Sequence, residues 1–286
     1  MQKIDFFTGK GGTGKSTNAI IFALKKVKNK KTLLCSLDPA HNLKDILLVN
    51  SFEEISRKIS DLYIQEPSIS EMLKEYLKEI EDQLKSNHNY LSSFNLLNDF
   101  GVIKHSPGME EYAIFYTFQK LFNNNKDKKE TLIFDMPPTA LSIRFFSLPK
   151  LSMIWLDKLI DLRYKIINKK KIIDKVKKEN SSDDKVLLNL LEQKQNYQKI
   201  HNVLIHSTIH VVLNPEPISI NESINLIKDL EELGYKDIVI HLNKYRKEIP
   251  EKIWELEQKY KMINIPFFDE MPVGINKLTL ITDAGK

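Results

Sequence analysis

The sequence has few of the residues on which cross-linked, membrane-spanning or strongly basic proteins depend. A single cysteine, Cys35, in 286 residues excludes a disulfide framework and any multi-cysteine metal or iron–sulfur site within one chain. No apolar run approaches the roughly 18 residues of a membrane-spanning helix, and a strand pattern stands where a signal peptide would lie. The net charge of +5 is modest and predicts no specific binding of nucleic acid. We therefore expect a soluble, cytoplasmic protein.

Glycine is also scarce, and its distribution is informative. Four of the 9 glycines fall between positions 9 and 14, inside the sequence TGKGGTGKST, which contains the phosphate-loop pattern G-x-x-x-x-G-K-S. An apolar run, Ile4 to Phe7, predicts a strand before the loop, and Ser16 to Val27 predicts a helix after it. In this arrangement backbone N–H groups and a helix N-terminus hold phosphate oxygens. The expected nucleotide-binding residues are Gly9, Lys10, Gly11, Gly12, Thr13, Gly14, Lys15, Ser16 and Thr17.

Individual residues around this loop suggest the chemistry of a nucleoside triphosphatase. Lys15 is placed to reach the β and γ phosphates, and the Ser16 hydroxyl to bind Mg²⁺. Asp135 ends a second apolar run, which is typical of the acid that holds Mg²⁺ through water. The alternative interpretation of the loop is a glycine-rich turn between a strand and a helix. We expect ATP and Mg²⁺ as cofactors.

Apolar runs of four to six residues recur along the chain with helical stretches between them. This alternation predicts an α/β fold with a doubly wound, mainly parallel sheet, as in a P-loop NTPase. Ligands of such sheets bind beyond the carboxyl ends of the strands, where the phosphate loop and the segments that begin at Asp38 and Asp135 would lie. The predicted strands are Lys3–Phe7, Thr32–Leu37, Asp61–Gln65, Thr131–Phe134, Ile209–Leu213, Asp237–Leu242 and Met262–Ile265.

Two further features resemble one family of P-loop ATPases. Lys10 follows the first glycine of the loop, as in dimeric ATPases with a deviant loop, and LDPAHNLKD, residues 37–45, resembles the switch I segment of the ArsA family. The resemblance implies a homodimer in which Lys10 reaches the partner's nucleotide, and an Asp38 that polarises the attacking water. Two alternatives stay open: Lys10 neutralises phosphate within its own subunit, and Asp38 caps a turn beside Pro39.

The resemblance to the ArsA family extends along the chain. PPTALSIRFFSLP, residues 137–149, is similar to its switch II, with Ala140-Leu141 where the family has Gly-His. NPEPISINES, residues 214–223, is similar to its nucleotide-proximal loop. The resemblance implies that Asn243 recognises the adenine ring and that Pro266 belongs to the final loop of the nucleotide site; a carboxamide can meet both N7 and N6 of adenine.

The segment between the fourth and fifth strands is too long for a crossover, which predicts a helical insert at 148–207 beside an ATPase domain at 1–147 and 208–286. Its apolar residues have helical spacing, as in Leu151, Trp155, Leu159 and Leu162, and a charged break follows. In the targeting ATPases of this family such an insert binds a client transmembrane helix. The alternative is helices that pack on each other or on the core. The lysine run at 169–178 is interpreted as a solvated face or mobile loop, with an acidic membrane surface as the alternative.

These observations favour a Mg²⁺-dependent ATPase of the ArsA type, a nucleotide-switched homodimer that engages a hydrophobic client helix or a membrane protein. A peripheral contact with the membrane is left open. One alternative is the energising subunit of an anion or arsenite efflux pump, although one cysteine per chain cannot supply a metalloid cluster. The other is a ParA- or MinD-like positioning ATPase.

Overall fold

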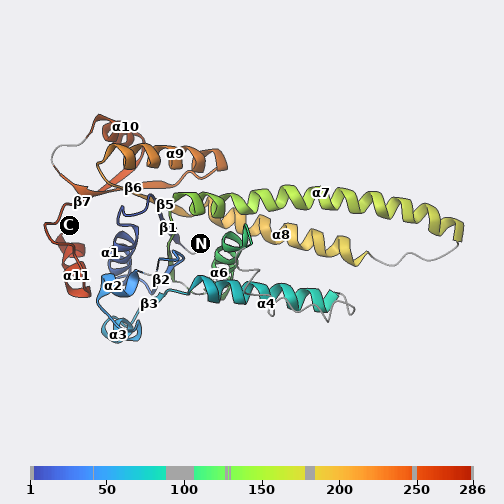
Figure 1. Cartoon of the computed structure of the whole chain (residues 1–286), viewed down its shortest axis with the longest axis horizontal. Helices are drawn as coiled ribbons and strands as arrows, with labels where there is room; N and C mark the ends of the chain where they lie inside the picture. The colour runs from blue at the N-terminus through green and yellow to red at the C-terminus, as the bar shows by residue number, and fades with distance from the viewer. Residues whose placement is uncertain are drawn as a thin grey trace. The chain divides into compact units, whose positions relative to one another are not determined.

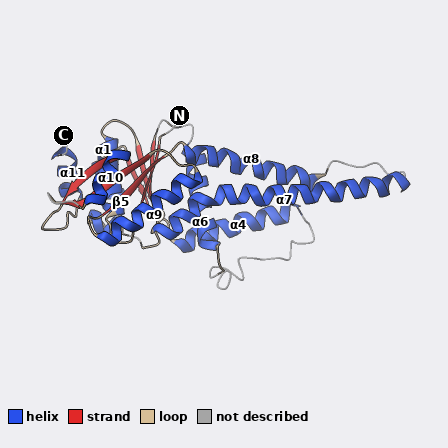
Figure 2. Ribbon diagram, turned by 90° about the horizontal axis from the view of Figure 1, so that it is seen from above, coloured by secondary structure: helices blue, strands red, loops and turns tan. Residues whose placement is uncertain are grey.

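The computed structural model describes residues 3–40, 42–87, 106–125, 128, 130–177, 184–246 and 250–284. Seven parallel strands form one sheet in the order β3-β2-β4-β1-β5-β6-β7. The strands are drawn as arrows in Figure 1 and in red in Figure 2. The strands are β1 (Ile4–Thr8), β2 (Thr32–Ser36), β3 (Leu62–Gln65), β4 (Thr131–Asp135), β5 (Thr208–Leu213), β6 (Ile238–Tyr245) and β7 (Lys261–Pro266). The prediction of an α/β fold with a parallel sheet is confirmed, and each predicted strand is present.

Burial explains why these runs are strands. Every residue of β1, β2, β4 and β5 is buried, as expected for central parallel strands that are covered by helices on both faces. The strand β3 lies at the edge of the sheet and alternates between buried and exposed residues. Cys35 is fully buried within β2, and burial raises the pKa of its thiol well above the usual range.

The central strand β1 presents aromatic side chains to both faces of the sheet. Phe7 belongs to an apolar cluster with Ala19 and Ile20 of α1 (Lys15–Val27). On the other face, Phe6 contacts Phe118 of α6 (Met109–Asn125), at a ring-centroid distance of 5.6 Å. Among the described residues, the other helices that lie wholly outside residues 146–206 are α2 (Leu43–Leu47), α3 (Glu53–Lys58), α4 (Ile69–Asn87), α9 (Pro217–Leu233), α10 (Glu251–Lys259) and α11 (Ile275–Ala284).

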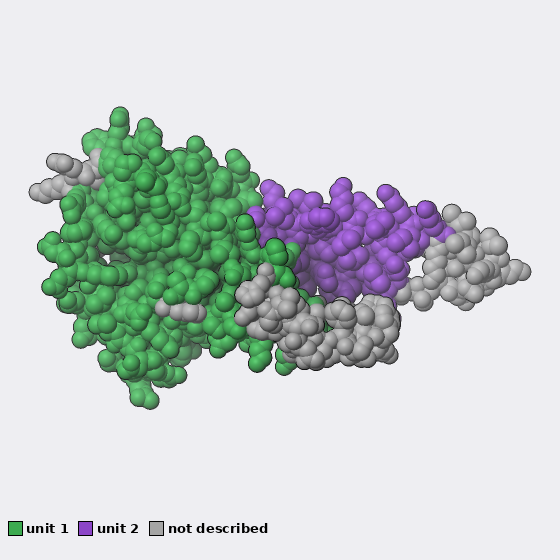
Figure 3. All heavy atoms as spheres, viewed as in Figure 1, with its two compact units in different colours: residues 1–145, 207–286 green, residues 146–206 purple. Residues whose placement is uncertain are grey.

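The chain forms two compact units, residues 1–145 with 207–286 and residues 146–206 (Figure 3). We call them the ATPase unit and the helical unit. The helix α7 (Thr139–Lys177) begins in the first and continues through Pro149 into the second, which also contains α8 (Lys185–Ile205). The interpretation of the lysine run as a loop is wrong for residues 169–177, because α7 continues to Lys177; the alternative of a solvated helix face stays a prediction. Residue 178 lies outside the described part of the chain.

The helical unit carries apolar side chains both in buried and in exposed positions. Phe146 is fully buried at the start of the unit, and three further buried residues of α7, Leu148, Leu156 and Ile160, are separated by multiples of four residues, which places them on one helix face. Two ion pairs connect the helices: Arg163 donates to Asp184, the N-cap residue of α8, with Nη2–Oδ2 at 2.9 Å, and Lys194 pairs with Asp157. No helix among the described residues is long and apolar enough to cross a membrane.

Candidate functional site

The loop between β1 and α1 has a conformation that only glycine permits at two positions. Gly9 has φ +142°, and a Cβ atom there would stand 2.3 Å from the carbonyl oxygen of Val212 in the neighbouring strand β5. Gly14, the N-cap of α1, has φ +91°, and its Cβ would stand 2.4 Å from Nδ2 of Asn243. The glycine pattern in the sequence therefore reflects close approaches of the loop to β5 and β6.

Side-chain amides hold consecutive carbonyl groups of this loop. Asn243 of β6 donates its Nδ2 hydrogen to the carbonyl of Thr13 at 2.8 Å, and Asn18 of α1 donates to the carbonyl of Gly14 at 2.9 Å. The Thr13 hydroxyl in turn donates to the carbonyl of Lys10 at 2.8 Å. These bonds turn the carbonyl groups toward the protein. In a planar trans peptide the N–H group points away from the carbonyl group, so the N–H groups of the same peptides face outward, where a ligand can bind them.

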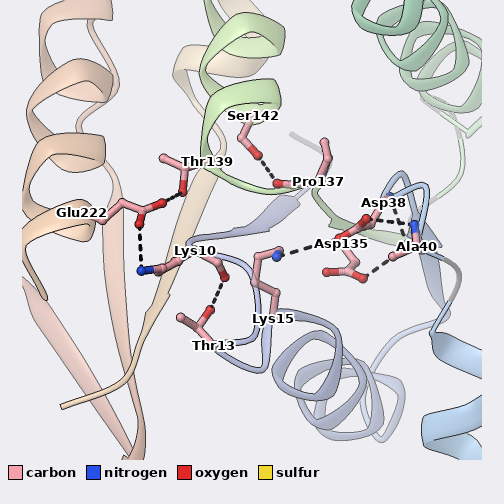
Figure 4. Close-up of polar contacts among 11 residues, drawn as sticks. Lys10, Thr13, Lys15, Asp38, Ala40, Asp135, Pro137, Thr139, Ser142 and Glu222 are labelled. Carbon is pink, nitrogen blue, oxygen red and sulfur yellow. Dashed lines mark hydrogen bonds and ion pairs between the residues drawn. The ribbon is translucent and has the colours of Figure 1, made fainter. Parts of the chain in front are cut away.

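Lys15 and Asp38 lie together at the carboxyl ends of β1 and β2 (Figure 4). The Nζ atom of Lys15 is 3.8 Å from Oδ2 of Asp38, and both side chains are largely buried. The other carboxylate oxygen, Oδ1, accepts a hydrogen bond from the N–H of Ala40 at 3.1 Å. Asp38 thus caps the turn beside Pro39 and at the same time directs one oxygen toward Lys15, so the two interpretations of this residue are compatible.

Asp135 ends β4 and is fully buried. Burial raises the pKa of its carboxyl group to about 7, while the Ser16 hydroxyl and the charge of Lys15 act in the opposite direction. Oδ2 accepts a hydrogen bond from Ser36 at 3.2 Å. Oδ1 is buried and has no hydrogen-bond partner among the residues that the structure describes. A divalent cation or its bound water would satisfy this oxygen, so Ser16 and Asp135 fit a Mg²⁺ site.

Most of the predicted residues line two adjoining pockets, whereas Gly9, Lys10, Thr13 and Asp135 line neither. One, of about 470 Å³, is lined by residues of the phosphate loop together with Asp38, Asp45 and Pro138. The second, of about 360 Å³, is lined by Asn243 and Pro266. Gly12, Gly14 and Thr17 border both. The structure therefore brings together most of the residues predicted for the phosphates and those predicted for the base. His41, within the segment similar to switch I, lies outside the described residues.

Several residues of the second pocket were not predicted. Lys244 has φ +56°, an uncommon conformation for a residue with a side chain. Met271 borders both pockets, and the Arg246 guanidinium lies 4.0 Å from the ring centroid of Phe267. Lys244 lies near the end of β6, where the register with β7 shifts, and Phe267 and Met271 lie in a loop. Arg246 does not line the pocket but contacts Phe267, which does. No sequence pattern singles out Lys244, Arg246 or Met271. Asn243 donates one N–H to the carbonyl of Thr13, so its carbonyl oxygen and its second N–H remain to form hydrogen bonds with an adenine base.

Lys10 has a partner within its own chain. Its Nζ atom is 3.4 Å from Oε2 of Glu222 on α9, and Oε1 of the same carboxylate accepts a hydrogen bond from the Thr139 hydroxyl at 2.9 Å (Figure 4). Thr139 begins α7, within the segment similar to switch II, and Arg144 of this segment forms an ion pair with Glu111 of α6. Glu222 was part of a recognised sequence segment, but its contact with Lys10 was not predicted.

The sequence matches a protein family described as anion-transporting ATPase (ArsA) over residues 2–281. Among its relatives is a protein of Aquifex aeolicus, provisionally named arsenical pump-driving ATPase 2, which is 28% identical over 97% of each chain. An ATPase ASNA1 homolog of Entamoeba histolytica is 30% identical over 55% of this chain and 49% of its own length. The ATPase GET3 of Komagataella phaffii is 34% identical over 50% of this chain and 44% of its own.

Proposed function

The chain belongs to the ArsA family of anion-transporting ATPases, and we propose that it acts as a nucleotide-switched homodimer that engages a hydrophobic client helix. ATP hydrolysis is the activity of this family. The observation that supports the site of hydrolysis is the convergence of the phosphate loop, Asp38 and Asp135 at the carboxyl ends of three neighbouring strands. This is the place where an open parallel sheet binds its ligands.

Each residue of the site has a proposed role in hydrolysis. N–H groups of the loop and Lys15 hold the phosphates, and Ser16 and Asp135 hold Mg²⁺, the latter through water. The bound cation would neutralise charge on the β and γ phosphates. Asp38 keeps one oxygen toward Lys15, where it can accept a proton from the attacking water and align it. Asn243 and Pro266 border the pocket for the adenine ring.

Lys10 supports the proposal of a dimer, because its weak contacts within its own chain allow its ammonium group to bind the nucleotide of a partner subunit. Its side chain is 35% exposed, and the one ion pair that it forms among the described residues is with Glu222. Exposed pairs of this kind contribute about 0–1 kcal/mol. A γ phosphate of a partner subunit is a stronger attraction for the same ammonium group. We propose that closure of the dimer transfers Lys10 from Glu222 to the partner's nucleotide. Glu222 also accepts from Thr139 through its other oxygen, so the transfer would leave this carboxylate without its cation at the start of α7.

The proposed client surface is an apolar stripe on α7, which we define as Leu151, Trp155, Leu159, Leu162 and Ile166. These side chains are spaced by three or four residues and lie on one side of the helix. Each of them is between 45% and 71% exposed. Exposed apolar patches of this kind mark sites of interaction with proteins or membranes. Their spacing fits contact with another apolar helix.

A defined reporter tests this proposal. The Asp38→Asn protein, which we expect to bind ATP without fast turnover, is coexpressed with a soluble domain that ends in one apolar helix of about 20 residues. We expect light scattering to show an ATP-dependent dimer, with reporter bound in ATP and released in ADP. A reporter in which three charges interrupt the helix is the control. Equal recovery of both reporters, or no dimer in ATP, would contradict the proposal.

A second candidate function is supported by the names of two relatives. Both are provisionally named arsenical pump-driving ATPases, and they match 97% and 99% of this chain. In that case the protein would energise a membrane transporter, and its partner would be a polytopic protein. The control of such a role by a cysteine-bound metalloid has no basis here, because Cys35 is the one cysteine of the sequence and is buried.

A further inference from the structure

Four buried polar side chains form one continuous chain of hydrogen bonds beneath the phosphate loop. Asp5 Oδ1 lies 3.0 Å from Nε2 of His210, and Nδ1 of His210 lies 2.8 Å from Nε2 of His241. Nδ1 of His241 lies 3.2 Å from Oδ1 of Asn18, whose Nδ2 donates to the carbonyl of Gly14 at 2.9 Å. The four side chains belong to β1, β5, β6 and α1, and each is at most 3% exposed.

The direction of each hydrogen bond follows from the two ends of the chain. The carbonyl of Gly14 can only accept, so the atom of Asn18 that faces it is Nδ2, and Oδ1 faces His241. Because Oδ1 can only accept as well, Nδ1 of His241 carries a hydrogen. Three hydrogen bonds therefore connect an acceptor at Asn18 with a carboxyl group at Asp5, and they need three protons. Two neutral imidazole rings supply two.

The third proton lies in the hydrogen bond between Asp5 and His210. Burial, followed by the charge of His210, lowers the pKa of His241 to about 3, so this ring stays neutral. His241 then accepts at Nε2 from Nδ1–H of His210, and the remaining proton lies between His210 and Asp5. The ring of His210 also stacks on Phe7, with centroids 4.4 Å apart and planes 4° apart. An aromatic face is a favourable neighbour for a protonated imidazole.

This order of protons determines how Asn18 holds the loop. If His241 carried its proton on Nε2 instead, its Nδ1 lone pair would repel Oδ1 of Asn18. The carboxamide would then turn over and place its oxygen against the carbonyl of Gly14. With the observed order, the Asn18 carboxamide adds a second hydrogen bond to the Gly14 carbonyl, which also accepts from the backbone N–H of Asn18 at 2.9 Å. The two bonds together hold the peptide plane between Gly14 and Lys15, so that the Lys15 N–H points to the opposite side. In phosphate loops, N–H groups of this kind bind phosphate oxygens.

We infer that Asp5, His210, His241 and Asn18 form a positioning relay that sets the orientation of the Asn18 carboxamide and thereby the phosphate-binding geometry of the loop at Gly14. None of these side chains lines the two pockets of the candidate site. The relay therefore acts on nucleotide binding through the backbone of the loop. The inference rests on the proposed nucleotide site at residues 9–17.

Two substitutions of His241 separate this role from general stability. In His241→Asn, the carboxamide reaches the position of Nδ1 and can still donate to Asn18, whereas His241→Gln reaches the position of Nε2 and leaves Asn18 without a donor. We expect the KM for ATP to rise at least about 10-fold in His241→Gln and about 3-fold or less in His241→Asn, with kcat within about 2-fold in both. Thr208→Val, which removes a hydroxyl of the neighbouring strand β5 that donates to Oδ2 of Asp237, is the control for loss of a hydrogen bond within the same sheet.

Nitrogen-15 NMR of the histidine rings gives a readout that does not depend on activity. In the ligand-free protein we expect His241 as the neutral Nδ1–H tautomer and His210 with both nitrogens protonated or sharing a proton with Asp5. An Nε2–H tautomer at His241, or equal KM values in His241→Asn, His241→Gln and Thr208→Val, would overturn the relay. If the NMR result holds but substitutions in residues 9–17 leave ATP binding intact, the proposed nucleotide site is wrong and the relay geometry stands.

Discussion

The ATPase unit and the helical unit differ in where their large apolar side chains lie, in the core or in a row on the surface. In the ATPase unit, Phe6 and Phe7 of β1 are fully buried on the two faces of the sheet, and polar groups gather at the strand ends. In the helical unit, Trp155 and Leu162 of α7 are 71% and 53% exposed. The ATPase unit also has exposed apolar side chains, such as Trp254 on α10 and Leu280 on α11, but these lie on separate elements. The row on α7 leaves apolar surface that a partner can cover, which points to chemistry in one unit and recognition in the other.

This contrast also separates two kinds of variant. Changes at the strand ends of the ATPase unit should alter hydrolysis and dimerisation. Changes on the apolar stripe should alter client capture and leave basal hydrolysis in place. A strand-end variant that alters client capture alone, or a stripe variant that alters basal hydrolysis, would contradict this separation of roles between the two units.

The largest effect is expected for Lys10→Ala. A cation delivered across an interface to the transferring phosphate contributes about 10³–10⁵ in rate, so we expect turnover to fall at least about 1000-fold and the ATP-dependent dimer to be lost. Phosphate release and light scattering measure the two properties. Lys30→Ala, which changes an exposed lysine beyond the end of α1, is the control. A Lys10→Ala protein that dimerises and hydrolyses ATP normally would remove the cross-subunit role.

Asp38→Asn should give the next largest effect. Loss of a general base lowers rates by about 100-fold or more, while an uncharged amide at this position keeps the shape of the site, so we expect ATP binding to remain. Turnover and the affinity for a fluorescent ATP analogue distinguish these properties. Asp61→Asn, at the amino end of β3 and away from the ligand side of the sheet, is the control. Turnover near that of the parent protein would leave Asp38 with its turn-capping role alone.

Trp155→Glu tests the helical unit. A charge in the middle of the apolar stripe should reduce capture of the helix-tipped reporter at least about 10-fold, because the glutamate would lose its hydration in an apolar contact. Basal hydrolysis should stay within about 2-fold of the parent. Trp254→Glu is a matched control, since Trp254 lies on α10 of the ATPase unit and is 62% exposed. Equal loss of capture in both variants would assign the effect to surface charge rather than to the stripe.

The smallest effect is expected for Glu222→Gln. Removing the resting partner of Lys10 should favour the ATP-bound dimer by up to about 5-fold, the range of a surface ion pair. Glutamine keeps an oxygen that can accept from Thr139. Raising the salt concentration should reproduce part of the effect in the parent protein and none in the variant, because salt screens exposed pairs. A dimer that is weaker in Glu222→Gln would show that Glu222 supports closure instead of opposing it.

The parts of the fold that follow local rules were predictable from the sequence. The strand β4 is a continuous apolar run, and the loop at Gly9 and Gly14 needs glycine because neighbouring backbone and side-chain atoms approach closely. Asp38 and Asp135 were found because each directly follows or ends such a strand. Parallel strands then bring these residues together without further information.

The remaining features depend on contacts between distant segments. Lys10 and Glu222 are separated by most of the chain, and so are Asp5 and His210. The sequence offered no reason to connect them, because a buried histidine has the same local pattern whether or not it has a partner. The continuation of α7 through the lysine run was also missed, since a dense run of like charges favours a break in a helix and here the helix continues to Lys177.

Site-specific crosslinking tests the central claim most directly. A photoactivatable amino acid replaces Leu162 on the apolar stripe or, as a control, Trp254 on α10, in the Asp38→Asn protein with the helix-tipped reporter present. The account predicts crosslinks from position 162 to the apolar helix of the reporter in ATP, few in ADP, and none from position 254. Crosslinks that are independent of nucleotide, or that arise equally from both positions, would contradict a nucleotide-switched client site on the helical unit.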